Sequence, residues 1–259
     1  MYVFVIAGDG AEAGLKRLLA ELEGRIGVVR ETEATGDGGV VAARGDTEYV
    51  VDDGWRASGE GLSVAETIDR LAPDHEYAAL IGVEDVDVPT IAVDGGPEDA
   101  EMAVPRADAL DVGAARTAIR EGEPRETLES LVAAVKRSEQ ADRAGAISTF
   151  TGRVRKRDGA DDDPTEYLEF EKYDGVAERT MRTIERELEG REGVLDVRLH
   201  HRTGRVEAGE DIVFVVVLAG HRREAFRAVE DGIDRLKDEV PLFKKEVTAS
   251  ETFWVHERG

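Results

Sequence analysis

Apolar and polar positions in the first part of the chain follow the pattern of short buried strands alternating with amphipathic helices. An apolar run opens the chain, and a glycine-rich turn separates it from four leucines at helical spacing. The predicted strands are 2–7, 77–81 and 89–93, and the predicted helices are 15–22, 64–71 and 112–119. Because strands and helices alternate, we expect an α/β sandwich with a mostly parallel sheet.

Glycine and proline punctuate residues 95–124, and we place a domain boundary there, between a first domain at 1–122 and a second at 123–259. An amphipathic helix at 125–137 leads into the second domain. The predicted elements beyond it are strands at 146–154, 167–170, 194–200 and 212–219, helices at 176–189 and 222–237, and a final extended segment at 242–255. The run 212–218 is apolar on both faces, which predicts a central strand covered on each side. The second domain is therefore also of mixed α and β class.

Acidic residues dominate the composition. The 259 residues include 57 acidic and 34 basic ones, only seven of them lysine, and the formal net charge is −23. This composition is typical of a halophile's proteins, in which a hydrated acidic surface maintains solubility at high salt. Residues 1–100 carry 22 acidic and 7 basic residues, whereas residues 144–259 carry 26 and 20. Only the second part can therefore gather positive charge around an anionic ligand, and a nucleic-acid partner is not expected.

The chain contains no cysteine, which excludes a disulfide framework, a thiolate zinc site, an iron–sulfur cluster and a cysteine nucleophile. Any sulfur chemistry must use sulfur that a partner brings. We expect neither a metal site nor a resident cofactor. No apolar run approaches the roughly 20 residues that span a bilayer, and the start of the chain lacks a charged secretory n-region, so we expect a cytoplasmic protein without membrane contact.

The glycine-rich turn at 8–14 departs from a phosphate-binding loop. Gly8 and Gly14 are six positions apart rather than five, and Leu15 and Lys16 stand where that loop has lysine and a hydroxyl. Asp9 adds negative charge that repels phosphate. The layout still resembles the family of molybdopterin-guanine dinucleotide adaptor proteins over about residues 1–120. This resemblance implies a degenerate P-loop-like α/β domain.

Basic residues form four clusters near predicted strand and helix ends of the second domain. Their members are Arg153 and Arg155, then His221 and Arg222, then Lys237 with Lys244 and Lys245, and finally Arg258. A helix N-terminus favours an anion, so together they suggest a site for a phosphate and a carboxylate-like group. Each cluster also has a structural interpretation, as solvated edge charges, helix-end cations or partners of nearby acids.

Several motifs resemble the large, catalytic subunit of molybdopterin synthase over about residues 125–259. They are Thr-Phe-Thr-Gly-Arg-Val-Arg at 149–155, Leu-Glu-Phe-Glu at 168–171, His-Arg at 201–202, Gly-His-Arg at 220–222, Leu-Lys at 236–237 and Pro-Leu-Phe-Lys-Lys-Glu at 241–246. The resemblance implies an α/β hammerhead fold and a homodimer within a heterotetramer. It also implies a small ubiquitin-like partner whose C-terminal Gly-Gly thiocarboxylate gives two sulfurs to cyclic pyranopterin monophosphate, forming the dithiolene of molybdopterin.

The same resemblance implies roles for individual residues. Lys237 and Lys244 match the catalytic lysines. The substrate-binding positions are Arg153, Arg155, His221, Arg222, Lys245 and Arg258.

His221 and Lys237 lie at the two ends of one predicted helix, about 24 Å apart at 1.5 Å per residue. A small pterin cannot reach both, so a shared site predicts a two-fold dimer.

Two other classes of function remain open for this sequence. A non-catalytic adaptor of molybdenum cofactor biosynthesis would keep both halves for protein binding only. An RNA-binding module fits less well, because the chain lacks the basic field and aromatic platforms that such modules use.

Overall fold

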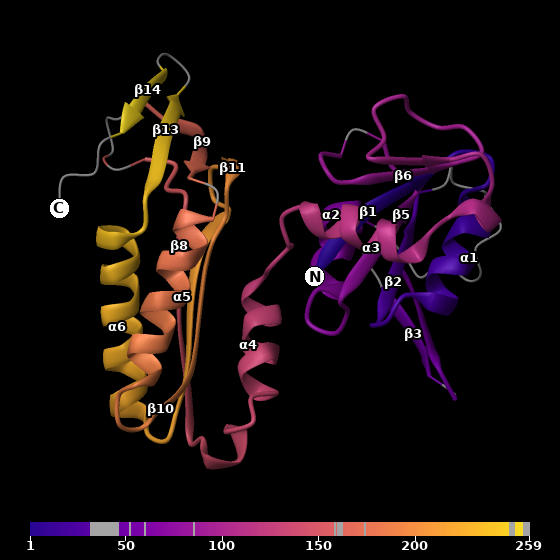
Figure 1. Cartoon of the computed structure of the whole chain (residues 1–259). Coiled ribbons are helices and arrows are strands. Elements are labelled where there is room, and N and C mark those ends of the chain that lie inside the picture. The colour runs from indigo at the N-terminus through magenta and orange to yellow at the C-terminus, as the bar shows by residue number, and fades with distance from the viewer. Residues whose placement is uncertain are drawn as a thin grey trace. The chain divides into compact units, whose positions relative to one another are not determined.

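The computed structural model describes residues 1–31, 47–51, 53–59, 61–84, 86–157, 159, 163–173, 175–248 and 252–255. The chain divides into two compact units, Met1–Glu126 and Thr127–Gly259 (Figure 1). This division lies four residues beyond the boundary expected from the glycine and proline pattern.

The first unit is built on a five-stranded parallel sheet with helices on both faces. Its strands are β1 (Tyr2–Ala7), β2 (Ile26–Arg30), β5 (Tyr77–Ile81), β6 (Thr90–Val93) and β7 (Met102–Val104), in the order β2-β5-β1-β6-β7. Helices α1 (Ala11–Glu21) and α3 (Val112–Glu121) cover one face, and α2 (Val64–Leu71) covers the other. A separate hairpin joins β3 (Thr47–Val51) to β4 (Trp55–Gly59), and a 3-10 turn spans Ala107–Ala109. The predicted α/β class with a parallel sheet is confirmed.

The second unit contains a three-stranded antiparallel sheet that forms its main core. The strands are β8 (Ala146–Arg153), β10 (Val194–His201) and β12 (Asp211–Ala219), in the order β10-β12-β8. Helices α5 (Val176–Glu189) and α6 (Arg222–Glu239) pack on one face, and α4 (Leu128–Lys136) packs on the other (Figure 1). A 3-10 turn at Ala141–Arg143 follows α4. The central strand β12 is covered on both sides, as its unbroken apolar run predicts.

A second, four-stranded sheet completes this unit. Its strands are β11 (Gly204–Glu207), β9 (Thr165–Lys172), β13 (Leu242–Thr248) and β14 (Thr252–Val255), in the order β11-β9-β13-β14. The extended segment predicted at 242–255 is in fact two antiparallel strands, with Lys244 in register with Val255. Strand β11 was not predicted. Among the described helices of both units, none is long and apolar enough to cross a membrane.

The outer edge of β10 is capped by carboxylates from α5. The Leu199 N–H donates to Glu185 Oε1 at 2.8 Å, and the Val197 N–H donates to Glu189 Oε1 at 3.0 Å. An uncapped edge strand offers these donors to other chains. Burial raises the pKa of Glu185 to about 7, against the opposing effects of the Leu199 N–H and of Arg198.

We expect Glu185→Gln to stabilise the protein at neutral and alkaline pH. The amide oxygen still accepts the Leu199 N–H, and the buried charge is removed. Because the pKa of Glu185 is higher in the folded state than in the unfolded state, the wild-type carboxyl penalises folding above about pH 7, and the penalty disappears as the pH falls towards about 4.5. The variant should be more stable by about 1 to 2 kcal/mol at about pH 8 and equal at about pH 4.5.

Urea unfolding of the full chain over this pH range measures the difference. Glu192→Gln, at an exposed position of the same unit, is the matched control. A gain in stability that did not change with pH would contradict the assignment to Glu185.

Candidate functional site

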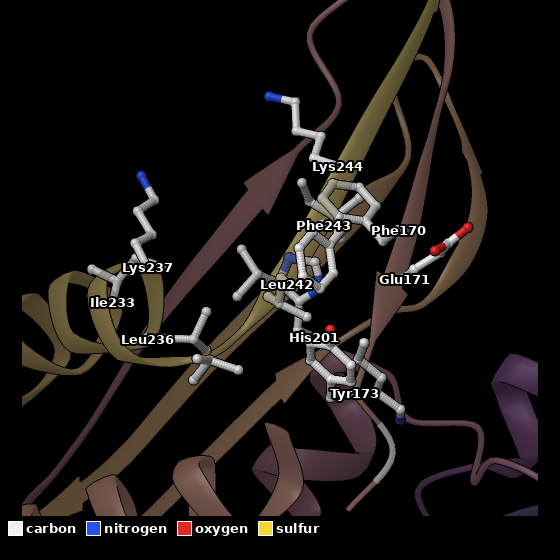
Figure 2. A pocket seen from close by; sticks show the side chains of 14 residues that line it. Phe170, Glu171, Tyr173, His201, Ile233, Leu236, Lys237, Leu242, Phe243 and Lys244 are labelled. Carbon is white, nitrogen blue, oxygen red and sulfur yellow. The ribbon is translucent and has the colours of Figure 1, made fainter. Parts of the chain in front are cut away.

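Two lysines come together where α6 ends and β13 begins. Lys237 lies in the last turn of α6, directly after Leu236, which is almost fully buried, and Lys244 lies in β13. Both amino groups extend towards the same side (Figure 2). Within the described ranges, neither lysine has an ion-pair or hydrogen-bond partner, so two ammonium groups are available for an anion.

Two cavities adjoin these lysines. The larger has a volume of about 770 Å³ and the smaller about 600 Å³. Lys237 and Lys244 line both cavities, together with Ile212 and Val213 of β12. A ligand in either cavity can therefore contact the same pair of ammonium groups.

The smaller cavity is the more polar one. Arg153 and Arg155 line it, on either side of the buried Val154, in agreement with their predicted spacing along the strand. The Arg153 Nε lies 2.9 Å from Asp211 Oδ1, and its Nη2 donates to the Gly209 carbonyl. These contacts hold the Arg153 guanidinium at the cavity wall, where a phosphate is a suitable ligand.

The larger cavity has an aromatic and basic lining. Phe170 packs edge-to-face on His201, with ring centroids 4.7 Å apart, and Tyr173 packs in the same way on Phe243 at 5.5 Å. Lys172 also lines this cavity, with a side chain only 13% exposed and its Nζ 3.5 Å from Glu178 Oε1. The cavity thus combines apolar surface with positive charge.

Three of the predicted site residues lie elsewhere on the described part of the second unit. His221 caps the N-terminus of α6 and Arg222 begins it, so both lie at the opposite end of the helix from Lys237 and line neither cavity. Lys245 faces away from Lys244 because successive residues of a strand point to opposite faces. Its Nζ lies 2.9 Å from Glu169 Oε2, and this hydrogen bond raises the pKa of Lys245.

Arg258 lies outside the described residues. The structure therefore gives no position for the eighth residue of the predicted set.

Sequence reasoning did not select Lys172, Tyr173, His201 or Phe243 for the site. The available signal was period two along β9, which places Lys172 on the same face as Phe170. In the described part of the chain, no group of three or more His, Asp or Glu side chains could hold a metal ion.

Known proteins resemble this chain over both units. A model of the MoaE protein family matches residues 124–239. A protein of Haloferax volcanii named "Probable molybdopterin synthase" is 52% identical over 266 residues, and the match covers both chains in full. The chain belongs to the molybdopterin synthase family.

Other family members match the second unit. The molybdopterin synthase catalytic subunit of Cereibacter sphaeroides is 45% identical over 112 residues, which cover 43% of this chain and 74% of that protein. Molybdopterin synthase from Staphylococcus aureus, whose crystal structure is known, is 32% identical in sequence. The structural match covers 52% of this chain and 93% of the Staphylococcus aureus chain, with a TM-score of 0.46.

The glycine turn of the first unit is closed by its own backbone. The Asp9 N–H donates to the Asp94 carbonyl and the Gly10 N–H to the Val93 carbonyl, both at 3.0 Å. A Cβ on Gly8, whose φ is +93°, would lie 2.3 Å from the Val93 oxygen. In a phosphate-binding loop such N–H groups point at the anion. In this turn both N–H groups already donate to carbonyl oxygens of the chain itself.

A negative charge also occupies the start of α1. Glu12, in its first turn, accepts two hydrogen bonds from Arg30, each 3.0 Å long. The carboxylate repels an incoming phosphate and neutralises a nearby guanidinium that could have bound one.

We expect the first unit not to bind nucleotide at this turn. Addition of Mg-ATP, Mg-GTP or inorganic phosphate should leave its thermal unfolding unchanged, because the donors and the helix end are occupied from within the chain. Calorimetric titration is the direct measurement. Saturable nucleotide binding that was lost in a Gly8→Ala variant would show this expectation to be wrong.

Proposed function

We propose that this chain is the catalytic subunit of molybdopterin synthase, a sulfurtransferase of molybdenum cofactor biosynthesis. Its sulfur donor is the C-terminal thiocarboxylate of a small ubiquitin-like partner, and its acceptor is cyclic pyranopterin monophosphate. The observation that carries the proposal is the pair of adjoining cavities that share Lys237 and Lys244.

The reaction brings together two ligands, the pterin and the partner's C-terminal tail. The two cavities differ in polarity, and each suits one of these ligands. The smaller cavity, with Arg153 and Arg155, suits the phosphate of the pterin. The larger cavity suits a partner's peptide tail, because it offers apolar surface along its length and ammonium groups for the terminal anion. Sulfur would then be delivered at the lysines, where the cavities adjoin.

Each transfer makes one carbon–sulfur bond and breaks another. The thiocarboxylate sulfur bonds to a pterin carbon in place of an oxygen, whose bond to that carbon breaks and which departs with a proton. The bond between the sulfur and the partner's carbonyl carbon is then cleaved. Water supplies the oxygen that returns the partner's terminus to a carboxylate. Lys237 and Lys244 stabilise the negative charge of the thiocarboxylate and of the developing intermediate, and either can move a proton to a departing group. Two such transfers give the dithiolene.

The separation of His221 and Arg222 from Lys237 bears on assembly. Helix α6 spans Arg222–Glu239, so its two ends are about 25 Å apart. A complete site with all of these residues needs the N-terminal end of α6 from a second copy. We therefore extend the proposal to a homodimer with sites shared between subunits.

The first unit is proposed to be a degenerate relative of the P-loop adaptor domains of cofactor synthesis, in which the phosphate site is closed. A docking role towards other enzymes of the pathway fits such a unit. The alternative, that the whole chain is a non-catalytic adaptor, is less favoured because four of the predicted cations of the second unit line defined cavities. They are Arg153, Arg155, Lys237 and Lys244.

We expect full conversion to require both lysines. When the thiocarboxylated partner and the cyclic precursor are added to the wild type, mass spectrometry should detect the dithiolene product. Lys237→Ala and Lys244→Ala should each lower the rate by about 10²- to 10⁴-fold, because each removes a charge at the reacting groups. Lys136→Ala, at an exposed position in α4, should retain the wild-type rate. Absence of product from a wild-type protein that binds the partner would favour the adaptor.

Complementation between two inactive variants tests the shared site. Chains carrying Lys237→Ala and chains carrying His221→Ala are unfolded together, refolded and assayed. Mixed dimers contain one site without either substitution, so part of the activity should return. If each variant is inactive alone and the refolded mixture remains inactive although mixed dimers are present, the sites are not shared.

A further inference from the structure

An exposed aromatic pair lies beside the lysines of the larger cavity. Tyr173 directly follows β9, and Phe243 lies in β13. Their rings pack edge-to-face at an interplanar angle of 78°, yet the two residues remain 61% and 43% exposed. Both residues line the larger cavity (Figure 2). The pair therefore forms part of the cavity's rim.

Exposed rings are unusual on such an acidic protein. The large apolar residues that are exposed in the described part of the second unit are Ile147, Tyr173, Val176, Phe226 and Phe243. Three of these five gather here, because the Val176 N–H donates to the Tyr173 carbonyl at 3.0 Å and so lies beside this rim. Exposed rings in mutual contact beside a cavity are a candidate site of protein contact.

The charges around the cavity indicate what the partner carries. Lys172, Lys237 and Lys244 line it, which is three of the seven lysines in the chain. Glu171, in register with Phe243, also lines it. The lysines attract an anionic chain end and Glu171 repels it. The chain end therefore binds with its charge towards the lysines and away from Glu171. The rim then contacts the uncharged part of the same partner.

We propose that Tyr173 and Phe243 anchor the small sulfur-carrier subunit by packing against apolar side chains that flank its C-terminal tail. This rests on the proposed function and adds the surface that holds the partner's folded body while the tail reaches the lysines. Tyrosine and phenylalanine suit this task because each offers a large contact area and has only two side-chain torsions to fix. The aromatic pair increases the affinity for the partner, whereas the lysines promote the sulfur transfer.

The test separates binding from chemistry. Calorimetric titration with the unmodified carboxylate form of the partner gives Kd, and turnover with the thiocarboxylated form at saturation gives kcat. Tyr173→Ala and Phe243→Ala should each raise Kd at least about tenfold, as expected for aromatic rings that the bound partner buries. Both variants should leave kcat within about twofold. Tyr173→Phe keeps the ring and should keep the wild-type Kd.

Tyr49→Ala is the matched control. Tyr49 belongs to the first unit and is 63% exposed, close to the value for Tyr173, so its removal should leave Kd unchanged. Circular dichroism checks the fold of each variant. If Phe243→Ala does not fold, Phe243→Leu replaces it and should still raise Kd, because it removes the aromatic contact.

Three results would decide against the anchor. They are a Kd within about twofold of wild type for both alanine variants, a fall in kcat with Kd unchanged, and no binding of the partner by the wild type. A wild type that binds the partner but forms no dithiolene would instead refute the proposed function. In that case the Kd values of the variants would still decide the docking role.

Discussion

The site depends on two ammonium groups that have no carboxylate partner among the described residues, in a chain whose net charge is −23. Elsewhere the abundant acids take up the cations, as when Arg235 pairs with Glu239 and Lys245 with Glu169. Lys237 and Lys244 have no such partner among the described residues. Their positive charge is therefore available to a ligand, and an anion between them relieves their mutual repulsion. The surrounding acidic surface makes this positive region distinct to an incoming anion.

The fold places these groups by joining two sheets at one point. Helix α6 packs on the three-stranded sheet, and the buried side chains of Leu236 and Val240 fix its last turn. Strand β13 follows at once and pairs with β9 in the other sheet. Ile212 and Val213 of β12 complete the wall that both cavities share. Since α6 is held by the core and β13 by its pairing with β9, the positions of the lysines do not depend on a surface loop.

Local periodicity predicted much of this arrangement. The helical stripe of α6 placed Lys237 near the helix end, and period two placed Arg153 and Arg155 together. Lys244 and Lys245 were predicted to share the site, whereas period two along β13 points their side chains to opposite faces. The reversal between β13 and β14 was missed, because residues 242–255 contain no glycine or asparagine to mark a tight turn. The role of Tyr173 was missed for another reason. It depends on the pairing of β9 with β13, which lie about 70 residues apart in the chain. The hydrophobic pattern of neither segment predicts that pairing.

The two units use hydrogen-bond donors and charge in opposite ways. In the first, backbone carbonyls of residues 93 and 94 satisfy the N–H groups of the glycine turn, and Glu12 neutralises Arg30. In the second, cations line open cavities. The Haloferax volcanii relative matches the chain through both units, so the first unit is part of the shared architecture although backbone hydrogen bonds close its glycine turn. An acidic α/β unit is well suited to contacts with proteins and poorly suited to anionic small molecules.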